Sequence, residues 1–184
     1  MAKRYTKITN KLQSFIEQQH MFFVGTAAPE GRVNVSPKGM DSLRVLGPNK
    51  VVWLNLTGSG NETAAHLQES ARMTLMFCAF EGKPMILRLY GQARVIYPGQ
   101  DAWDSTIALF PPFVGVRQVI EMDIDLALTS CGHAVPLYDY VADRDLLVKT
   151  AKKKGEAGLK AYRDKVNRVS LDGKPIYSPE NEAE

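Results

Sequence analysis

The feature that most constrains this sequence is a succession of short apolar segments separated by tight turns, from residue 21 to residue 97. β-Branched and aromatic residues dominate the segments, and runs such as Pro29-Glu30-Gly31 and Gly82-Lys83-Pro84 separate them. This pattern is typical of antiparallel strands joined by hairpins. Because such a sheet protects its edges by curling, we expect an antiparallel meander of about five or six strands that closes into a small barrel.

Helical patterns flank the predicted sheet. Residues 6–19 place their apolar side chains on one face, with Thr6 or Thr9 as the N-cap. Further helices are predicted at residues 62–69, 98–109 and 141–165, the last weakened by Gly155 and Gly158. The predicted strands are residues 21–27, 32–36, 42–46, 51–54, 72–80, 85–97 and 116–128, with a break at Pro37 and a bulge at Gly91.

The fold class is therefore mainly β with flanking helices. At 184 residues the chain is long enough for one domain with a continuous core. We expect a single domain at residues 1–177, with a C-terminal helical extension, followed by a disordered acidic tail at residues 178–184.

Composition excludes several classes of protein. The net charge of +3 is too small to indicate nucleic-acid binding. Two cysteines do not make a disulfide framework, and the N-terminus lacks the apolar core of a signal peptide. No apolar run is long enough for a membrane span. We expect a reduced, cytoplasmic protein that binds neither nucleic acid nor membrane.

Residues 53–66 combine the end of a buried strand, a loop with two glycines and the start of a short helix. Unpaired amides at a helix start attract anions, so this loop is a candidate phosphate cradle. Ser59, Asn61 and Thr63 add hydroxyl and amide groups there. The alternative is a capping box, in which Ser59 and Glu62 satisfy the amides of the helix itself.

Three isolated side chains are ambiguous in the sequence. Lys38 follows a strand and could reach over the barrel rim to an anion, although a solvated turn lysine would look the same. Cys131 and His133 are metal-ligating types, but no second pair completes a zinc site, so we predict no metal. We expect Cys131 to be a packed small residue and Cys78, within an apolar strand, to be buried.

Lysine and arginine are frequent between residues 149 and 165. They alternate with acidic residues, alanine and glycine rather than with aromatic residues that stack on bases. A solvated helix face therefore accounts for the run better than a nucleic-acid surface.

Five segments, taken in order, resemble the pyridoxamine 5′-phosphate oxidase-like family of FMN-binding split-barrel proteins. Three are FFVGTAAPEGRVNVSPKG at 22–39, VVWLNLTGSGNETAAHL at 51–67 and RMTLMFCAFEGKPMILRLYGQARVI at 72–96. Two later ones, TSCGHAVPLYDY at 129–140 and NRVSLDGKP at 167–175, resemble a branch of uncharacterised members rather than the oxidase itself. The resemblance covers most of the chain and depends on the order and spacing of these segments.

The resemblance implies a small antiparallel split β-barrel, a homodimer, and FMN bound in clefts between subunits. It places FMN contacts at residues 34–38, 53–55 and 59–63, and on strand 85–91 of the partner subunit. The implied cofactor-binding residues are Asn34, Val35, Ser36, Lys38, Leu54, Asn55, Ser59, Gly60, Asn61, Thr63 and Arg88.

Two departures from the oxidase pattern are visible. Asn61-Glu62-Thr63 stands where the oxidase carries Ser-Arg-Lys, so Lys38, Arg72 or Arg88 would have to supply charge to the phosphate. The Arg-x-His motif that holds the pyridoxine substrate near the oxidase C-terminus is absent. The resemblance thus implies flavin binding without oxidation of pyridoxamine phosphate.

The leading functional hypothesis is a flavin-dependent oxidoreductase with an unknown small-molecule substrate. Because the flavin carries the redox chemistry, the protein need not display an acid–base pair, and we identify no catalytic residue. The alternatives are a non-catalytic flavin-binding or flavin-sensing protein, and a reductase that uses deazaflavin F420 in the same cleft.

Overall fold

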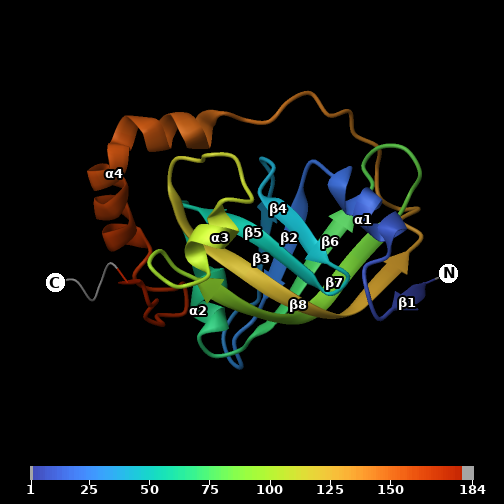
Figure 1. The fold of residues 1–184 in the computed structure, drawn as a ribbon, viewed down its shortest axis with the longest axis horizontal. Helices are drawn as coiled ribbons and strands as arrows, with labels where there is room; N and C mark the ends of the chain where they lie inside the picture. Colours follow the sequence, from blue (N-terminus) through green and yellow to red (C-terminus); the bar gives the residue numbers. More distant parts are fainter. Residues whose placement is uncertain (1, 180–184) are drawn as a thin grey trace.

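Strands form the centre of the molecule, and helices lie around them (Figure 1). The computed structural model describes residues 2–179. Its strands are β1 (Lys3–Tyr5), β2 (Phe22–Thr26), β3 (Asn34–Lys38), β4 (Leu43–Gly47), β5 (Lys50–Leu56), β6 (Arg72–Cys78), β7 (Ile86–Ile96) and β8 (Val116–Ser130). Its helices are α1 (Asn10–Glu17), α2 (Glu62–Leu67), α3 (Trp103–Ile107) and α4 (Leu146–Val166).

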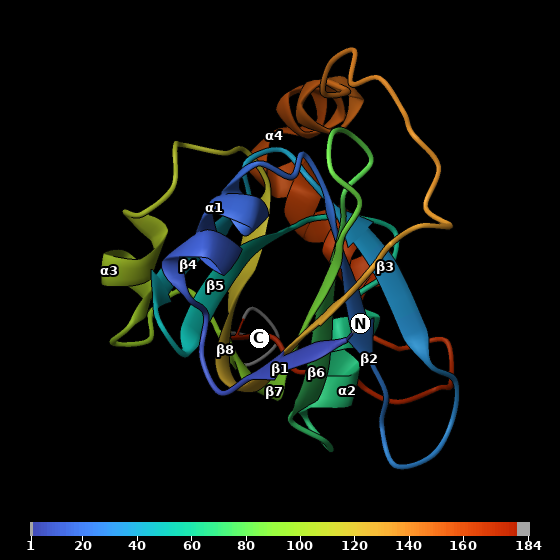
Figure 2. The same cartoon turned by 90° about the vertical axis from the view of Figure 1, so that its right-hand side faces the viewer.

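All strand pairs are antiparallel, in the order β3-β2-β6-β7-β8-β5-β4, and β1 pairs with β8 outside this path. Viewed along the strands, the sheet curves round on itself (Figure 2). The prediction of a mainly β, antiparallel split barrel is confirmed. The simple meander is wrong, because β2 pairs with β6 and the 15-residue β8 pairs with both β7 and β5. These long-range pairings bring β3 and β4 to the two ends of the strand order.

The predicted break at Pro37 is also wrong. β3 continues through Pro37 to Lys38, and these two residues lie opposite Phe23 and Phe22 of β2. Proline is tolerated because β3 is an edge strand, whose outer side needs no ladder hydrogen bond. The extension of β3 carries Lys38 to the end of the strand.

The interior of the barrel is filled by aromatic and aliphatic side chains around Trp53, Phe77 and Phe22. Helix α1 packs Leu12 and Ile16 into this core, and Thr9 caps it by accepting a hydrogen bond from the Leu12 amide, as predicted. A second cluster lies between β5, β8 and α3.

The predicted bulge at Gly91 is confirmed by a register shift between Tyr90 and Gly91. A Cβ at Gly91 would lie 1.9 Å from the Asp123 carbonyl oxygen. Only glycine therefore fits this approach of β7 to β8.

The C-terminal part differs from its prediction in detail. Helix α3 begins at Trp103 rather than residue 98, because Gly99, with φ +85°, turns the chain first. Residues 131–145, called the strap below, run over the top of the barrel to α4 (Figure 1). Helix α4 kinks at Gly155, where φ is +61°. Of the predicted acidic tail, residues 180–184 lie outside the described residues.

Candidate functional site

A cavity of about 470 Å³ opens beside the edge strand β3. The cavity is lined by residues of strands and loops and by one residue of α4. The lining consists of Asn34, Ser36, Pro37, Lys38, Gly39, Met40, Ser42, Leu54, Asn55, Leu56, Gly58, Ser59, Gly60, Asn61, Glu62, Thr63, Arg117 and Leu147. A volume of this size is typical of small-molecule and cofactor sites.

The structure brings nearly all the residues predicted to bind the cofactor to this cavity. Those on its wall are Asn34, Ser36, Lys38, Leu54, Asn55, Ser59, Gly60, Asn61 and Thr63. Val35 alternates to the outer face of β3 and is 64% exposed. Arg88 lies on β7, where its Nη1 donates to the Ser130 hydroxyl at 3.2 Å, and it does not line this cavity within its own chain. The Nε of Arg72 donates a hydrogen bond to the Ser70 hydroxyl, and Arg72 does not line the cavity either.

Two cationic side chains line the cavity, and neither forms an ion pair with a residue in the range 2–179. Lys38 places its Nζ 5.3 Å from the centre of the Trp53 ring. Burial, reinforced by the charge of Arg117, lowers the pKa of Lys38 to about 8. Burial and the nearby Arg163 lower the pKa of Arg117 to about 10. An anion placed between these cations would relieve their repulsion.

Arg117 is held in place by neutral acceptors. Its guanidinium donates to the Gly60 carbonyl at 2.8 Å, to Asn55 Oδ1 at 3.2 Å and to Asn167 Oδ1 at 2.7 Å. Asn167 in turn donates to the Gly58 carbonyl at 3.1 Å. Because carbonyl and amide oxygens orient the guanidinium without neutralising it, the full positive charge remains available to a ligand.

Sequence reasoning missed Arg117, Asn167 and Leu147. The only local signal was the polar pair Arg117-Gln118 at the start of an otherwise apolar predicted strand. Asn167 lies 109 residues after Gly58 in the chain, so no local pattern links the two.

Several buried polar atoms around the cavity have no hydrogen-bond partner in the described structure. They are the hydroxyls of Ser36 and Ser42 and the Nε of Arg117. Unsatisfied buried groups are rare and call for an explanation, of which an absent ligand is one. Ser42 follows Met40 and Asp41, which adopt the left-handed region with φ of 63° and 54°. Such strain in non-glycine residues is concentrated at binding sites.

Asn61 and Thr63 shape the wall of the cavity through internal hydrogen bonds. Gln118 Nε2 donates to Asn61 Oδ1 at 2.9 Å, and Asn34 Nδ2 donates to the Thr63 hydroxyl at 3.3 Å. The Thr63 hydroxyl can still donate, whereas Asn61 Oδ1 points inward to Gln118 and also accepts from Asn55.

The capping-box alternative is wrong. Asn61, not Ser59, is the N-cap of α2, and its side chain makes no capping hydrogen bond. The Glu62 carboxylate accepts from the Leu171 amide at 3.0 Å instead. The C-terminal segment thus engages Glu62, the one carboxylate that lines the cavity among the residues that the structure describes.

The two cysteines are both free and differ in environment. Cys78 is buried, as predicted, whereas Cys131 is exposed and its predicted packing is wrong. Gly132 takes the packed position, because a Cβ there would lie 2.9 Å from the Met85 nitrogen. Among residues 2–179, no three histidine, cysteine or acidic side chains gather where they could hold a metal.

Two properties of the helices bear on other expectations. Lys152, Lys153 and Lys154 of α4 are exposed, as expected for a solvated helix face. Within the described part of the chain, no helix is both long and apolar enough to span a membrane.

Comparisons with known proteins identify the family of the chain. The family model described as "Pyridoxamine 5'-phosphate oxidase" matches residues 8–131. A curated relative from Aspergillus flavus, the pyridoxamine 5′-phosphate oxidase family protein ustO, is 37% identical over 191 residues. The alignment covers 93% of this chain and 76% of that protein.

Solved structures share the fold at much lower identity. A Lactobacillus delbrueckii protein, provisionally assigned as a pyridoxamine 5′-phosphate oxidase, has a TM-score of 0.53 at 18% identity, covering 67% of this chain and 94% of its own. HupZ from Group A Streptococcus has a TM-score of 0.52 at 18% identity, covering 65% of this chain and 91% of its own. At these identities the likeness concerns the fold alone.

Proposed function

Because the chain belongs to the pyridoxamine 5′-phosphate oxidase family, we propose that its cavity beside β3 binds FMN and that the protein is a flavin-dependent oxidoreductase acting on a small molecule. The observation that carries this proposal is the pair Lys38 and Arg117. Two partly buried cations on one cavity wall, without an ion-pairing carboxylate among the described residues, suit a phosphate.

The residues present fit the phosphate end of FMN. Lys38 and Arg117 would supply charge, and the unpartnered Ser36 and Ser42 hydroxyls would supply neutral donors. The loop before α2 brings Ser59 to the same wall. These groups replace the two cations of the oxidase triplet, which Asn61-Glu62-Thr63 lacks. In this proposal Arg117 joins Lys38 as the source of charge, in place of the other two residues that the sequence offered, Arg72 and Arg88.

The apolar part of the wall suits a flat ring system. Leu54 and Leu56 come from β5, Pro37 from β3, and Leu147 from the first turn of α4. Such a slot would exclude water and orient the ring through backbone hydrogen bonds. FMN, when bound, supplies hydride and electron transfer, while the protein holds the ring and its phosphate.

The proposal includes a homodimer in which strand 85–91 of the partner subunit completes the cofactor site. It is supported by apolar side chains that the described chain leaves exposed on and beside β3, namely Val33 and Val35. Exposed apolar side chains on an edge strand are candidates for contact with a second copy of the chain. Sedimentation at micromolar concentration checks it, and a monomer that retains cofactor would exclude it.

We expect no oxidation of pyridoxamine 5′-phosphate at an ordinary enzymatic rate. The chain lacks the Arg-x-His motif that would hold this substrate. Each lost charge-assisted hydrogen bond weakens binding by about 1.5–3 kcal/mol. Formation of pyridoxal phosphate during turnover assays would contradict this expectation.

The first experiment is to denature the purified protein and identify any released cofactor by mass. FMN supports the proposal, whereas F420 would identify a deazaflavin reductase. Turnover with a nicotinamide donor and an acceptor would then separate an oxidoreductase from a non-catalytic flavin-binding protein.

The second experiment tests the position of the phosphate. Lys38→Ala should weaken FMN binding by about 1–3 kcal/mol, and riboflavin binding much less, because riboflavin lacks the phosphate. Lys83→Ala is the matched control, since Lys83 is exposed and lies outside the cavity wall. Equal losses for the two flavins, or no loss for either, would show that Lys38 does not contact the phosphate.

A further inference from the structure

A second cavity, of about 900 Å³, lies beneath the strap. It shares no lining residue with the cavity beside β3. Three segments meet there: the end of α1 with the start of β2, the turn between β6 and β7, and the strap itself. Its lining is Gln18, Gln19, His20, Met21, Phe23, Phe80, Glu81, Gly82, Tyr138, Asp139, Tyr140, Val141 and Ala142.

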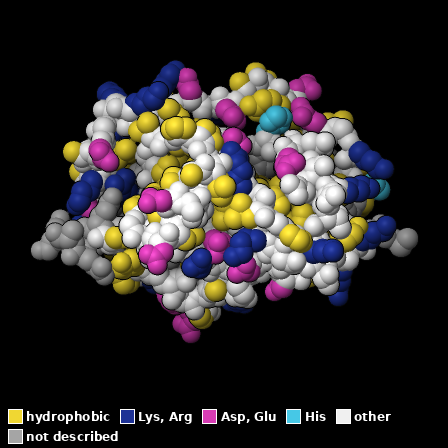
Figure 3. All heavy atoms as spheres, in the orientation of Figure 1, with side chains coloured by type: hydrophobic (Ala, Val, Ile, Leu, Met, Phe, Trp, Pro, Cys, Tyr) yellow, Lys and Arg dark blue, Asp and Glu magenta, His cyan; other side chains and the backbone are white. Residues whose placement is uncertain are grey.

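Aromatic rings form much of this wall. Phe80 and Tyr138 stack with centroids 5.4 Å apart, and His20 and Tyr140 stack at 3.6 Å with an angle of 7° between their planes. Tyr138 is nevertheless 62% exposed. Hydrophobic side chains gather along the upper rim of the molecule, where the strap crosses it (Figure 3). The rings are thus ordered by stacking while their free faces stay accessible.

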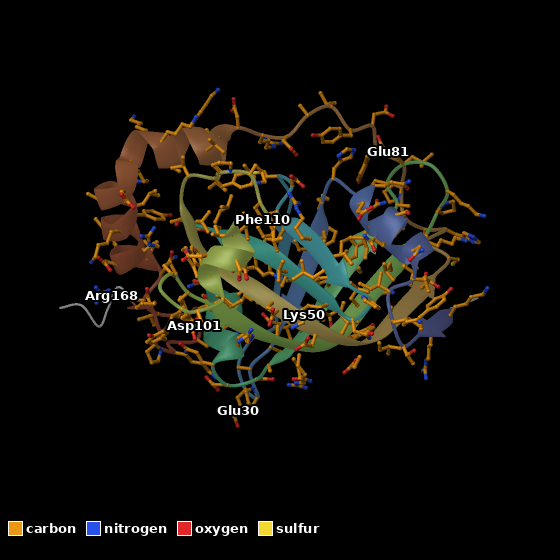
Figure 4. The ribbon with its side chains drawn as sticks, viewed as in Figure 1. Glu30, Lys50, Glu81, Asp101, Phe110 and Arg168 are labelled. Carbon is orange, nitrogen blue, oxygen red and sulfur yellow. The ribbon has the colours of Figure 1, made fainter. Side chains whose placement is uncertain are left out.

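Two hydrogen bonds donated by backbone amides hold the strap over the turn between β6 and β7, one accepted by a carbonyl and one by a carboxylate. The Tyr138 amide donates to the Phe80 carbonyl at 2.9 Å, and the Tyr140 amide donates to Glu81 Oε1 at 3.0 Å. Figure 4 shows Glu81 beside the strap. The aromatic wall and the carboxylate are therefore fixed relative to each other, as a preformed binding site requires.

The charges of the lining are of one sign. Glu81 and Asp139 are acidic, and no lysine or arginine among residues 2–179 lines this cavity. His20 Nε2 lies 3.8 Å from Glu81 Oε2, and this histidine is the one basic group of the wall. The cavity beside β3 has the opposite balance, because Lys38 and Arg117 line it with one carboxylate among the described residues, Glu62. A phosphate-bearing ligand would be repelled here.

We propose that the cavity beneath the strap binds an organic cation, such as an aromatic amine or a quaternary ammonium compound. The cation would lie against the faces of Tyr138 and Phe80, which attract positive charge, with the Glu81 carboxylate as its counter-ion. The apolar part of the ligand would contact Phe23 and Met21. This site does not depend on flavin binding, because the two cavities share no residue.

The test is a titration of the full chain with benzyltrimethylammonium, followed by calorimetry and by amide chemical shifts. Benzyl alcohol is the neutral control ligand and benzenesulfonate the anionic one. We expect the cation to bind at least about fivefold more tightly than either control, with shifts confined to the strap and the turn between β6 and β7. Equal affinity for cation and alcohol, or shifts elsewhere, would overturn the proposal.

Two variants separate the charge from the aromatic wall. Glu81→Gln keeps an acceptor for the Tyr140 amide but removes the charge, and Tyr138→Ala removes an exposed ring. Each variant should lower the affinity for benzyltrimethylammonium about fivefold. Glu30→Gln, at the opposite side of the molecule in Figure 4, is the matched control and should change nothing. Unchanged affinity in both cavity variants would overturn the proposal. If a second protomer fills the cavity and the cation does not bind, the proposal is also overturned.

Discussion

Residues 8–131, which the family model matches, are joined by strand pairing, whereas residues 132–179 are attached mainly through side-chain contacts. Among the described residues, the later region pairs as β structure only in the isolated bridge between Val169 and Pro175. Many of its attachments are polar: Arg32 pairs with Asp172, Glu69 with Lys174 at 2.7 Å, and Gln68 bonds the Pro175 carbonyl at 2.8 Å.

The difference between the two regions shows how a barrel common to the family gains features particular to this chain. The family-matched region supplies the cavity wall from β3, β5 and α2, whereas the C-terminal region adds Leu147 and orients Arg117 through Asn167. It also engages Glu62 through the Leu171 amide. The C-terminal region therefore adjusts the charge and shape of a cavity that the barrel creates.

The largest expected effect tests whether the C-terminal region is part of the folded core. Ile176 is 3% exposed and packs on Ala64 and Ala65 of α2. Ile176→Ala should lower the free energy of unfolding by about 2–5 kcal/mol in urea denaturation, through lost burial and the cavity left behind. Leu171→Ala, at a position that is 71% exposed, is the control and should stay within about 0.5 kcal/mol. Equal, small changes in the free energy of unfolding for Ile176→Ala and Leu171→Ala would mean that the C-terminal region is not part of the folded core.

The next effect tests the coupling between the two regions at the site. Arg117→Gln should weaken FMN binding by about 1.5–3 kcal/mol, and Asn167→Ala by about 1 kcal/mol, because the latter only loosens the guanidinium. Fluorescence quenching of FMN and of riboflavin measures the flavin affinity of each variant.

A double-mutant cycle then sharpens this result. Asn167→Ala should have little further effect on FMN affinity once Arg117 is replaced, since Asn167 acts through Arg117. Additive losses would show instead that Asn167 supports the loop through the Gly58 carbonyl alone.

A smaller effect concerns Lys38, which belongs to the barrel. Its pKa of about 8 in the free protein means that it loses its charge as pH rises through 8. A bound phosphate favours the charged form, so FMN affinity should fall above pH 8 by up to about tenfold per pH unit. Riboflavin affinity should change much less over the same range.

Lys38→Arg provides the control for this pH profile. Arginine stays protonated throughout, so the decline in FMN affinity above pH 8 should disappear. An unchanged slope in this variant would assign the pH dependence to another group.

The smallest effect is at the kink of α4. Gly155 has φ of +61°, and a Cβ there would meet nothing within 4 Å. Gly155→Ala should therefore lower the free energy of unfolding by about 1 kcal/mol or more through backbone strain alone, because with ψ of −178° the backbone lies in a region that only glycine adopts readily. Lys153→Ala, at an exposed position, is the control in the same denaturation series. If Gly155→Ala instead raised the free energy of unfolding, the helix would be able to straighten at this position without destabilising the protein.

The sequence by itself determined the elements whose signals are local. The alternation of apolar residues and turns predicted most strands. Thr6 and Thr9 were the two candidate helix caps, of which Thr9 is the cap, and Gly91 was predicted as the bulge. The position of the cavity wall followed from the same segments, with the family resemblance selecting residues 34–38 and 59–63. Each of these depends on residues a few positions apart, which side-chain period and turn chemistry control.

Only the tertiary structure decided which strands pair and which distant side chains meet. β2 pairs with its chain neighbour β3 on one side and with the distant β6 on the other, and Pro37 is tolerated because this leaves β3 at an edge. Arg117 reaches the cavity because β8 pairs with β5. Asn167 reaches Arg117 because α4 folds back after the strap. These contacts span 50 residues or more in the chain. Their cause is the burial of a common core, which no single stretch of sequence contains.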